Sequence, residues 1–206
     1  MAQNEVTKFD DNWVSAPADA RSIETREVYA HAGAALYFAQ CLEHEIVNSL
    51  GLVEIERIRR IKRPQSAAEL AEYEAQVDKI WDKNHEHTLG QLLNRLRESG
   101  ITIPPKLDSL LRQSLQVRNR FVHEYFRERA MDWLEADGRR VMADELKAMQ
   151  TLFQEADHTL HEVTEQIRNG LGITEDNVTL VGNLMKANAS EDEIDRAISE
   201  SFGEAK

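Results

Sequence analysis

The sequence predicts an all-α protein: an antiparallel bundle of four to five main helices with a short C-terminal helical extension. The chain has only 9 glycines and 4 prolines in 206 residues, which leaves few places for the many turns of a β protein. Apolar residues recur every three to four positions over long segments, the spacing of one helix face. The alternation of Ile and Val typical of strands is missing.

The first predicted helix begins near Ser22 and continues to Arg63, where Pro64 ends it. Its apolar stripe is rich in alanine, so a neighbouring helix can approach closely; it consists of Val28, Ala32, Ala35, Ala39, Leu42, Ile46 and Leu50. A capping box at Ser66–Glu69 then opens a second helix that runs to about Lys83.

A third, shorter helix is predicted from Thr88 to Ser99, with Gly100 placed to end it. An extended connector over residues 101–105 leads to a fourth helix near Pro105, a residue that is accepted in a first helical turn. The fifth helix is expected from about Arg139 to Asn169. Two short helices follow at about 174–188 and 190–202. We therefore divide the chain into a flexible leader (1–20), a bundle (21–170) and an acidic helical tail (171–206).

The net charge of −12 is concentrated in one part of the chain. Residues 132–206 contain 7 basic and 17 acidic residues, a net charge of −10. Two basic segments interrupt the rest: one over residues 57–63, and one from Arg112 to Arg129 with five arginines and two glutamates, a net charge of +3. The overall charge therefore argues against a broad nucleic-acid surface, but not against local contact with RNA.

Several classes of protein are excluded or disfavoured by composition. The single Cys41 excludes a disulfide framework and a zinc site built on several thiolates. No apolar run approaches the roughly 18 residues that a membrane span needs, and the polar N-terminus is unlike a secretory signal. Together these observations favour a cytoplasmic protein that does not enter membranes.

The segment from Arg118 to Tyr125 carries the strongest functional pattern, Arg-Asn-x3-His-x-Tyr. It resembles the motif of the HEPN superfamily, and it is most similar to the ribonuclease toxins of nucleotidyltransferase–HEPN pairs. Arg26 and His31 share the Arg-x4-His spacing. They lack the polar residue directly after the arginine and the tyrosine two residues after the histidine, so we set that pair aside.

The resemblance covers about residues 22–170 and implies a homodimeric, metal-independent endoribonuclease without a cofactor, from a toxin–antitoxin or antiviral defence system. Arg118, Asn119 and His123 from both subunits are then the catalytic residues. An imidazole that titrates near pH 6.5 transfers protons at neutral pH, and a guanidinium stabilises the charge that builds up on a phosphorane. Asn119 and His123 are i, i+4 neighbours on a helix, so Asn119 is placed to orient the ring.

The resemblance also implies that a partner nucleotidyltransferase modifies Tyr125. An antitoxin of another kind is the alternative partner. The other interpretation of Tyr125 is that it is a purely structural aromatic residue. Glu43 and Gln40 on the first helix are candidates to contact Arg118. The remaining histidines give no convincing metal site. A second hypothesis for the whole chain is a HEPN-like dimeric scaffold or protein-interaction module without catalysis.

Overall fold

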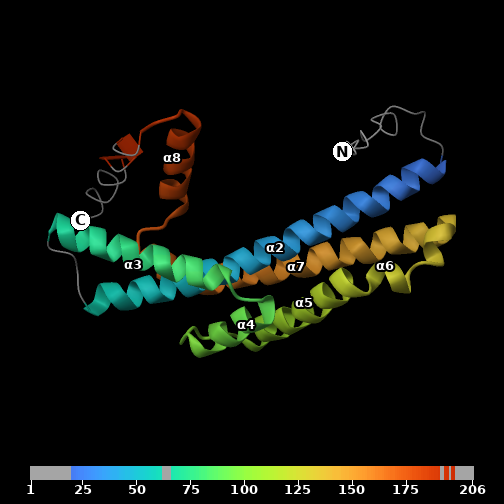
Figure 1. Cartoon of the computed structure of the whole chain (residues 1–206), viewed down its shortest axis with the longest axis horizontal. Coiled ribbons are helices and arrows are strands. Elements are labelled where there is room, and N and C mark those ends of the chain that lie inside the picture. Colours follow the sequence, from blue (N-terminus) through green and yellow to red (C-terminus); the bar gives the residue numbers. More distant parts are fainter. Residues whose placement is uncertain (1–19, 62–65, 191–192, 195, 198–206) are drawn as a thin grey trace, which may run out of the picture.

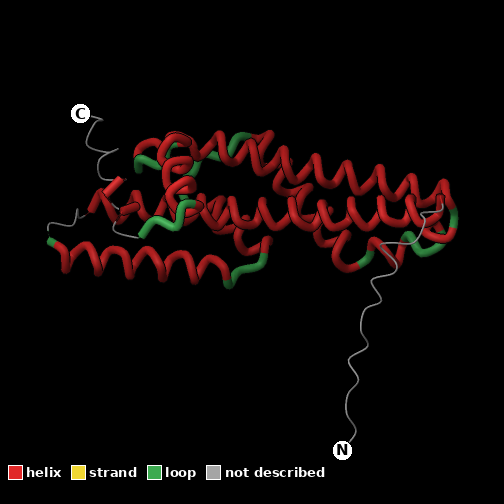
Figure 2. The backbone as a smooth tube through the Cα atoms, turned by 90° about the horizontal axis from the view of Figure 1, so that it is seen from above, coloured by secondary structure: helices red, strands yellow, loops and turns green. Residues whose placement is uncertain are grey.

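The computed structural model describes residues 20–61, 66–190, 193–194 and 196–197. Within these residues all regular structure is helical, which confirms the predicted all-α class (Figures 1 and 2). The helices are α2 (Ala20–Ile61), α3 (Ala67–His85), α4 (Leu89–Glu98), α5 (Pro105–His123), α6 (Tyr125–Glu128), η1 (Asp132–Leu134), α7 (Ala136–Gly170) and α8 (Glu175–Lys186).

The two longest helices, α2 and α7, form the main contact of the bundle, and they run parallel (Figure 1). Glu24 pairs with Arg139 near the start of both helices, and Glu45 pairs with Arg168 further along. Neighbouring helices in the chain are antiparallel, as the sequence predicts, for α5 against α7 and for α3 against α2. Counting the short α4, the chain reverses direction four times between α2 and α7, and an even number of reversals returns α7 to the direction of α2.

The core follows the alanine-rich stripe that the sequence indicated. Val28, Ala35, Leu42 and Ile46 on α2 are fully or almost fully buried. Facing them is a stripe of α7 at helical spacing, comprising Met142, Leu146, Met149, Phe153, Ala156 and Leu160. Burying apolar area of this kind is the main favourable term in folding, at roughly 25 cal/mol per Å², so the α2–α7 pair positions the rest of the chain.

The segment after α5 has a shape that the periodicity did not predict. Glu124 leaves the helical conformation with φ −132° and ψ −30°, so α5 ends at His123 and a separate short helix begins at Tyr125. The helix η1 then packs tightly on the start of α7. A Cβ added at Gly138 would collide with the backbone of Asp132, which explains why a residue without a side chain stands there.

Beyond the bundle, α8 contains no buried residue, and it stands apart from α7 in Figure 1. The first predicted tail helix, expected at about 174–188, is present as α8 over the slightly shorter range Glu175–Lys186. In the second, Glu193 accepts a hydrogen bond from the backbone N–H of Ser190 at 2.8 Å, but most of that helix lies outside the described residues, as do residues 1–19 and Pro64. No helix in the described ranges is long and apolar enough to cross a membrane.

Candidate functional site

Arg118 lies on the inner side of α5, where it contacts α2. Its Nε atom is 3.1 Å from Oε1 of Glu43, and both side chains are only about three-tenths exposed. This contact brings Glu43, one of the two candidates on the first helix, to the guanidinium. Gln40 is exposed to solvent, and no hydrogen bond joins it to Arg118 among the described residues. Since Nε is engaged, the two Nη atoms are the part of Arg118 left for a bound anion.

His123 is the last residue of α5 and is exposed. Asn119, one turn earlier, is also exposed, and its Oδ1 accepts a long contact of 3.5 Å from Arg118 Nη1. Within the described part of the chain, no hydrogen bond or ion pair joins His123 to Asn119 or to Arg118. One chain therefore places a cation and an accessible imidazole on the same helix without joining them.

Tyr125 is the largest fully buried side chain of this region. Its hydroxyl donates a hydrogen bond of 3.1 Å to the carbonyl oxygen of Met142 on α7. Burial raises the pKa of this hydroxyl, and the neighbouring carboxylate of Glu145 raises it further. The structural role is thus evident. Modification of Tyr125 stays a prediction, and it requires this segment to open because the oxygen that would be modified is inside.

Most arginines of the second basic segment are paired with carboxylates, some close by in the sequence and some on α2 and α7. Arg118 pairs with Glu43, Arg120 with Glu128 at 2.7 Å, and Arg129 with Asp132 at 3.0 Å. Arg129 also contacts Glu145, and Arg112 contacts Asp108. Arg127 is exposed. The net charge of +3 in the linear segment is therefore largely neutralised in three dimensions.

Exposed apolar side chains occur on α2, α5 and α6. On α2 they are Tyr29, Leu36 and Tyr37, with exposed fractions between 43% and 60%. On α5 and α6 they are Val122 and Phe126, and ring contacts connect the two sides, because Trp133 of η1 meets Tyr29 at 5.1 Å and Phe126 at 6.4 Å between ring centres. Exposed aromatic side chains that contact one another, as Tyr29, Trp133 and Phe126 do, form a candidate contact site for another molecule.

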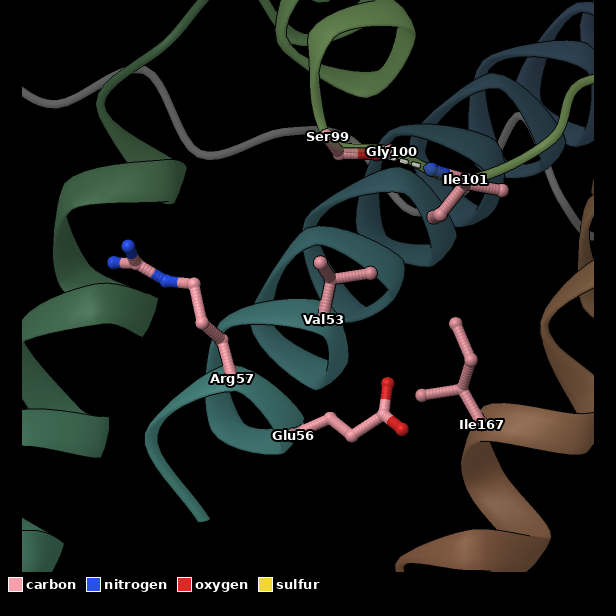
Figure 3. A pocket seen from close by; sticks show the side chains of 7 residues that line it. All are labelled: Val53, Glu56, Arg57, Ser99, Gly100, Ile101 and Ile167. Carbon is pink, nitrogen blue, oxygen red and sulfur yellow. Dashed lines mark hydrogen bonds between the residues drawn. The ribbon is translucent and has the colours of Figure 1, made fainter. Parts of the chain in front are cut away.

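A pocket of about 330 Å³ lies elsewhere, between the C-terminal half of α2, the end of α4 and the end of α7 (Figure 3). Val53, Ile101 and Ile167 provide its apolar lining, and Glu56 and Arg57 stand at its edge. Val53 is ten residues beyond Glu43, which is about 15 Å along an ideal helix. None of the predicted site residues lines this pocket.

The described residues contain no group of three or more His, Cys, Asp or Glu side chains arranged to hold a metal ion. The motif itself offers a guanidinium held by Glu43 and a solvent-accessible imidazole. The sequence did not reveal the helix break at Glu124 or the partner of Arg129, Glu145. The apolar spacing gave no signal of the helix break at Glu124. The pairing of Arg129 with Glu145 depends on a contact between residues 16 positions apart.

No protein-family model, curated protein or solved structure matches this chain.

Proposed function

We propose that the protein is a HEPN-type, metal-independent endoribonuclease that acts as a homodimer, in a toxin–antitoxin or antiviral defence system. The observation that carries the proposal is the arrangement around Arg118: Glu43 holds its Nε atom, its Nη1 atom lies 3.5 Å from Asn119 Oδ1, and the exposed His123 ends the same helix. A held cation and a free imidazole are the two groups that metal-free RNA cleavage needs.

In the proposed reaction, the 2′ oxygen of a ribose attacks the adjacent phosphorus as it loses its proton. The bond from phosphorus to the 5′ oxygen breaks, and that oxygen takes up a proton. His123 exchanges one of these protons, and the Nη atoms of Arg118 stabilise the negative charge on the phosphorane. The products are a 2′,3′-cyclic phosphate and a 5′ hydroxyl, with no change in oxidation state and no metal ion.

The homodimer is supported by the surface around the motif. His123 and Arg118 are five residues apart, about 140° around an ideal helix, so a second copy is the simplest way to complete the pair. The exposed Val122 precedes His123, and the exposed Phe126 contacts Trp133, which contacts the exposed Tyr29. Covering exposed apolar side chains of this kind stabilises a dimer.

The products of RNA incubation test the proposal. Full-length protein is mixed with a labelled single-stranded RNA and an excess of chelator, and the new ends are identified chemically. We expect cleavage to persist in chelator, to leave 2′,3′-cyclic phosphates, and to stop when the RNA carries a 2′-deoxy sugar at the cleaved position. Cleavage that requires a divalent metal, or that leaves 5′ phosphates, would contradict the mechanism.

Replacing Glu43 tests whether the contact to Arg118 positions the guanidinium. Glu43→Gln keeps the shape but removes the charged acceptor, and hydrogen bonds to charged groups contribute about 1.5–3 kcal/mol. We expect the cleavage rate to fall about 10-fold or more, with the helical content unchanged by circular dichroism. Gln40→Ala is the matched control on the same helix, and we expect its rate to equal that of the wild type.

The alternative function is a non-catalytic dimeric scaffold or protein-interaction module. The same exposed apolar surface favours it, and so does the pairing of most nearby arginines with carboxylates. A protein that forms a stable dimer in solution, with no RNA cleavage under any of these conditions, would support the scaffold instead.

A further inference from the structure

Two histidines from different helices meet on the surface where α3 ends against α2. The ring centres of His44 on α2 and His85 on α3 are 5.3 Å apart, with an angle of 59° between the ring planes. Both side chains are exposed to solvent. His44 directly follows Glu43, but it contacts α3, whereas Glu43 contacts Arg118 on α5. The fold therefore brings together two imidazoles that are far apart in the chain and that the candidate site does not use.

The polar contacts of the chain leave these two rings available. Of the seven histidines, four have a polar partner: His31 contacts Gln150, His87 contacts Arg95, His158 contacts Glu162, and His161 contacts Glu45. A fifth, His123, ends α5 and belongs to the candidate site. Within the described parts of the chain, no hydrogen bond or ion pair engages His44 or His85. Their ring nitrogens are thus open to a ligand from solvent.

A second contact fixes the register of the two helices that present the histidines. Trp81 stands one turn before His85, and Gly51 stands two turns after His44. A Cβ added at Gly51 would be only 2.6 Å from the Trp81 ring, so this ring packs directly on the backbone of α2. Because α2 and α3 are antiparallel, the contact of Trp81 with Gly51 and that of His85 with His44 belong to one pairing. The packing of a large side chain therefore sets where the two imidazoles meet.

The separation of the rings fits a shared metal ion. An imidazole nitrogen binds Zn²⁺ at about 2.0–2.1 Å, and the ring centre lies about 1.2 Å behind that nitrogen, so it is about 3.2 Å from the ion. At the tetrahedral angle, two such ring centres are about 5.2 Å apart. The separation of His44 and His85 is 5.3 Å. Both side chains are exposed, so each ring is free to turn one nitrogen toward a common point.

The chemistry of the two ligands selects the class of ion. Imidazole suits Zn²⁺, Cu²⁺ and Ni²⁺, whereas Mg²⁺ and Ca²⁺ prefer oxygen ligands. Two protein ligands are fewer than the three or four of catalytic and structural zinc sites, so water completes the coordination. An ion held in this way exchanges with solvent and binds reversibly.

We propose that His44 and His85 together bind one divalent transition-metal ion, of the class that includes Zn²⁺ and Cu²⁺. Each imidazole contributes the lone pair of one ring nitrogen, and the ion links the end of α3 to the middle of α2. Binding stabilises the folded chain, because the unfolded chain does not hold the two rings together. The ion takes no part in the RNA cleavage proposed above, which we expect to persist in chelator, so each proposal stands or fails alone.

Titration calorimetry of the full-length, chelator-treated protein with ZnCl₂ at neutral pH tests the site. We expect one Zn²⁺ per chain in the wild type. His44→Gln and His85→Gln should each weaken binding by at least about 10-fold, since the loss of a mere outer-shell partner already costs about 10–100-fold in metal affinity. His158→Gln, an exposed histidine of α7, is the matched control and should bind as the wild type does. A wild type that does not bind Zn²⁺, or either α2–α3 variant with unchanged affinity, would overturn the proposal.

Thermal unfolding provides a second readout of the link between the helices. Zn²⁺ should raise the Tm of the wild type and of His158→Gln, and leave the Tm of His44→Gln and His85→Gln unchanged. Mg²⁺ should raise none of them. Both histidines are exposed, so the variants keep the fold, which circular dichroism verifies. An equal rise of the Tm in all four proteins means that Zn²⁺ binds elsewhere, and the site is then refuted.

Cu²⁺ identifies the ligands directly. In electron paramagnetic resonance, each coordinated nitrogen splits the Cu²⁺ signal. We expect the pattern of two nitrogens in the wild type and of one in His44→Gln and in His85→Gln. A wild-type spectrum with fewer than two nitrogens shows that the two rings do not share an ion, and it too refutes the site.

Discussion

We expect His123→Ala and Arg118→Ala each to lower the rate of the proposed RNA cleavage by at least about 100-fold. A positioned general acid or base contributes about 10²–10⁴-fold, and removing one preorganised donor to a developing oxyanion costs a similar factor. His123 is exposed, so its removal leaves the core intact. The measurement is the single-turnover rate on a defined single-stranded RNA in chelator, with the helical content of each variant checked by circular dichroism.

Two substitutions on the surface serve as controls for this prediction. Arg127→Ala removes an exposed arginine close to the motif, and His158→Ala removes an exposed histidine of α7. We expect cleavage within about twofold of the wild type for both. If the four variants and the wild type cleave RNA equally, the activity comes from elsewhere, and Arg118 and His123 are not catalytic.

Glu24→Ala is expected to give the largest loss of stability, about 3–5 kcal/mol. The guanidinium of Arg139 is only 5% exposed, and it pairs with Glu24 at 2.7 Å while donating to the carbonyl of Trp133 at 3.1 Å. Removing the carboxylate leaves a buried cation without its partner, which is the costly way to break an ion pair. The free energy of unfolding from urea titration at pH 7 measures this loss.

Two companion variants show whether the cost comes from the unpaired charge. The double variant Glu24→Leu with Arg139→Met replaces both partners by apolar side chains of similar length, and we expect it to recover most of the lost stability. Asp144→Ala breaks an exposed pair with Lys147, where both side chains are more than half exposed, and should change stability by less than about 1 kcal/mol. A double variant as unstable as Glu24→Ala would contradict this account.

The expected contact partners differ in how well they could be predicted. Glu43 was a candidate because it stands on the first helix among apolar neighbours, and the structure places it 3.1 Å from Arg118. The partner of Arg139 had no comparable signal, because Glu24 is 115 positions away in the chain. The contact between His44 and His85 was hidden for the same reason. Periodicity shows which face of a helix is inside, but not which helix will face it.

By itself, the sequence determined the helices and the motif. Spacing of apolar residues, capping residues and a few glycines and prolines fix where helices begin and end, because these are local effects of backbone geometry and hydrogen bonding. They also determine that Arg118, Asn119 and His123 share one helix, and that Tyr125 follows them closely.

Only the tertiary structure decided that α2 and α7 run parallel, that Tyr125 is inside, and that Arg118 and Arg129 have partners on α2 and α7. Helix direction depends on the number of reversals that the connections make, which periodicity does not contain. The charge around the motif depends on carboxylates such as Glu43 and Glu145, which packing brings close from distant parts of the chain. Electrostatic interaction depends on distance in space, so a net charge of +3 along the sequence becomes a nearly neutral surface in the fold.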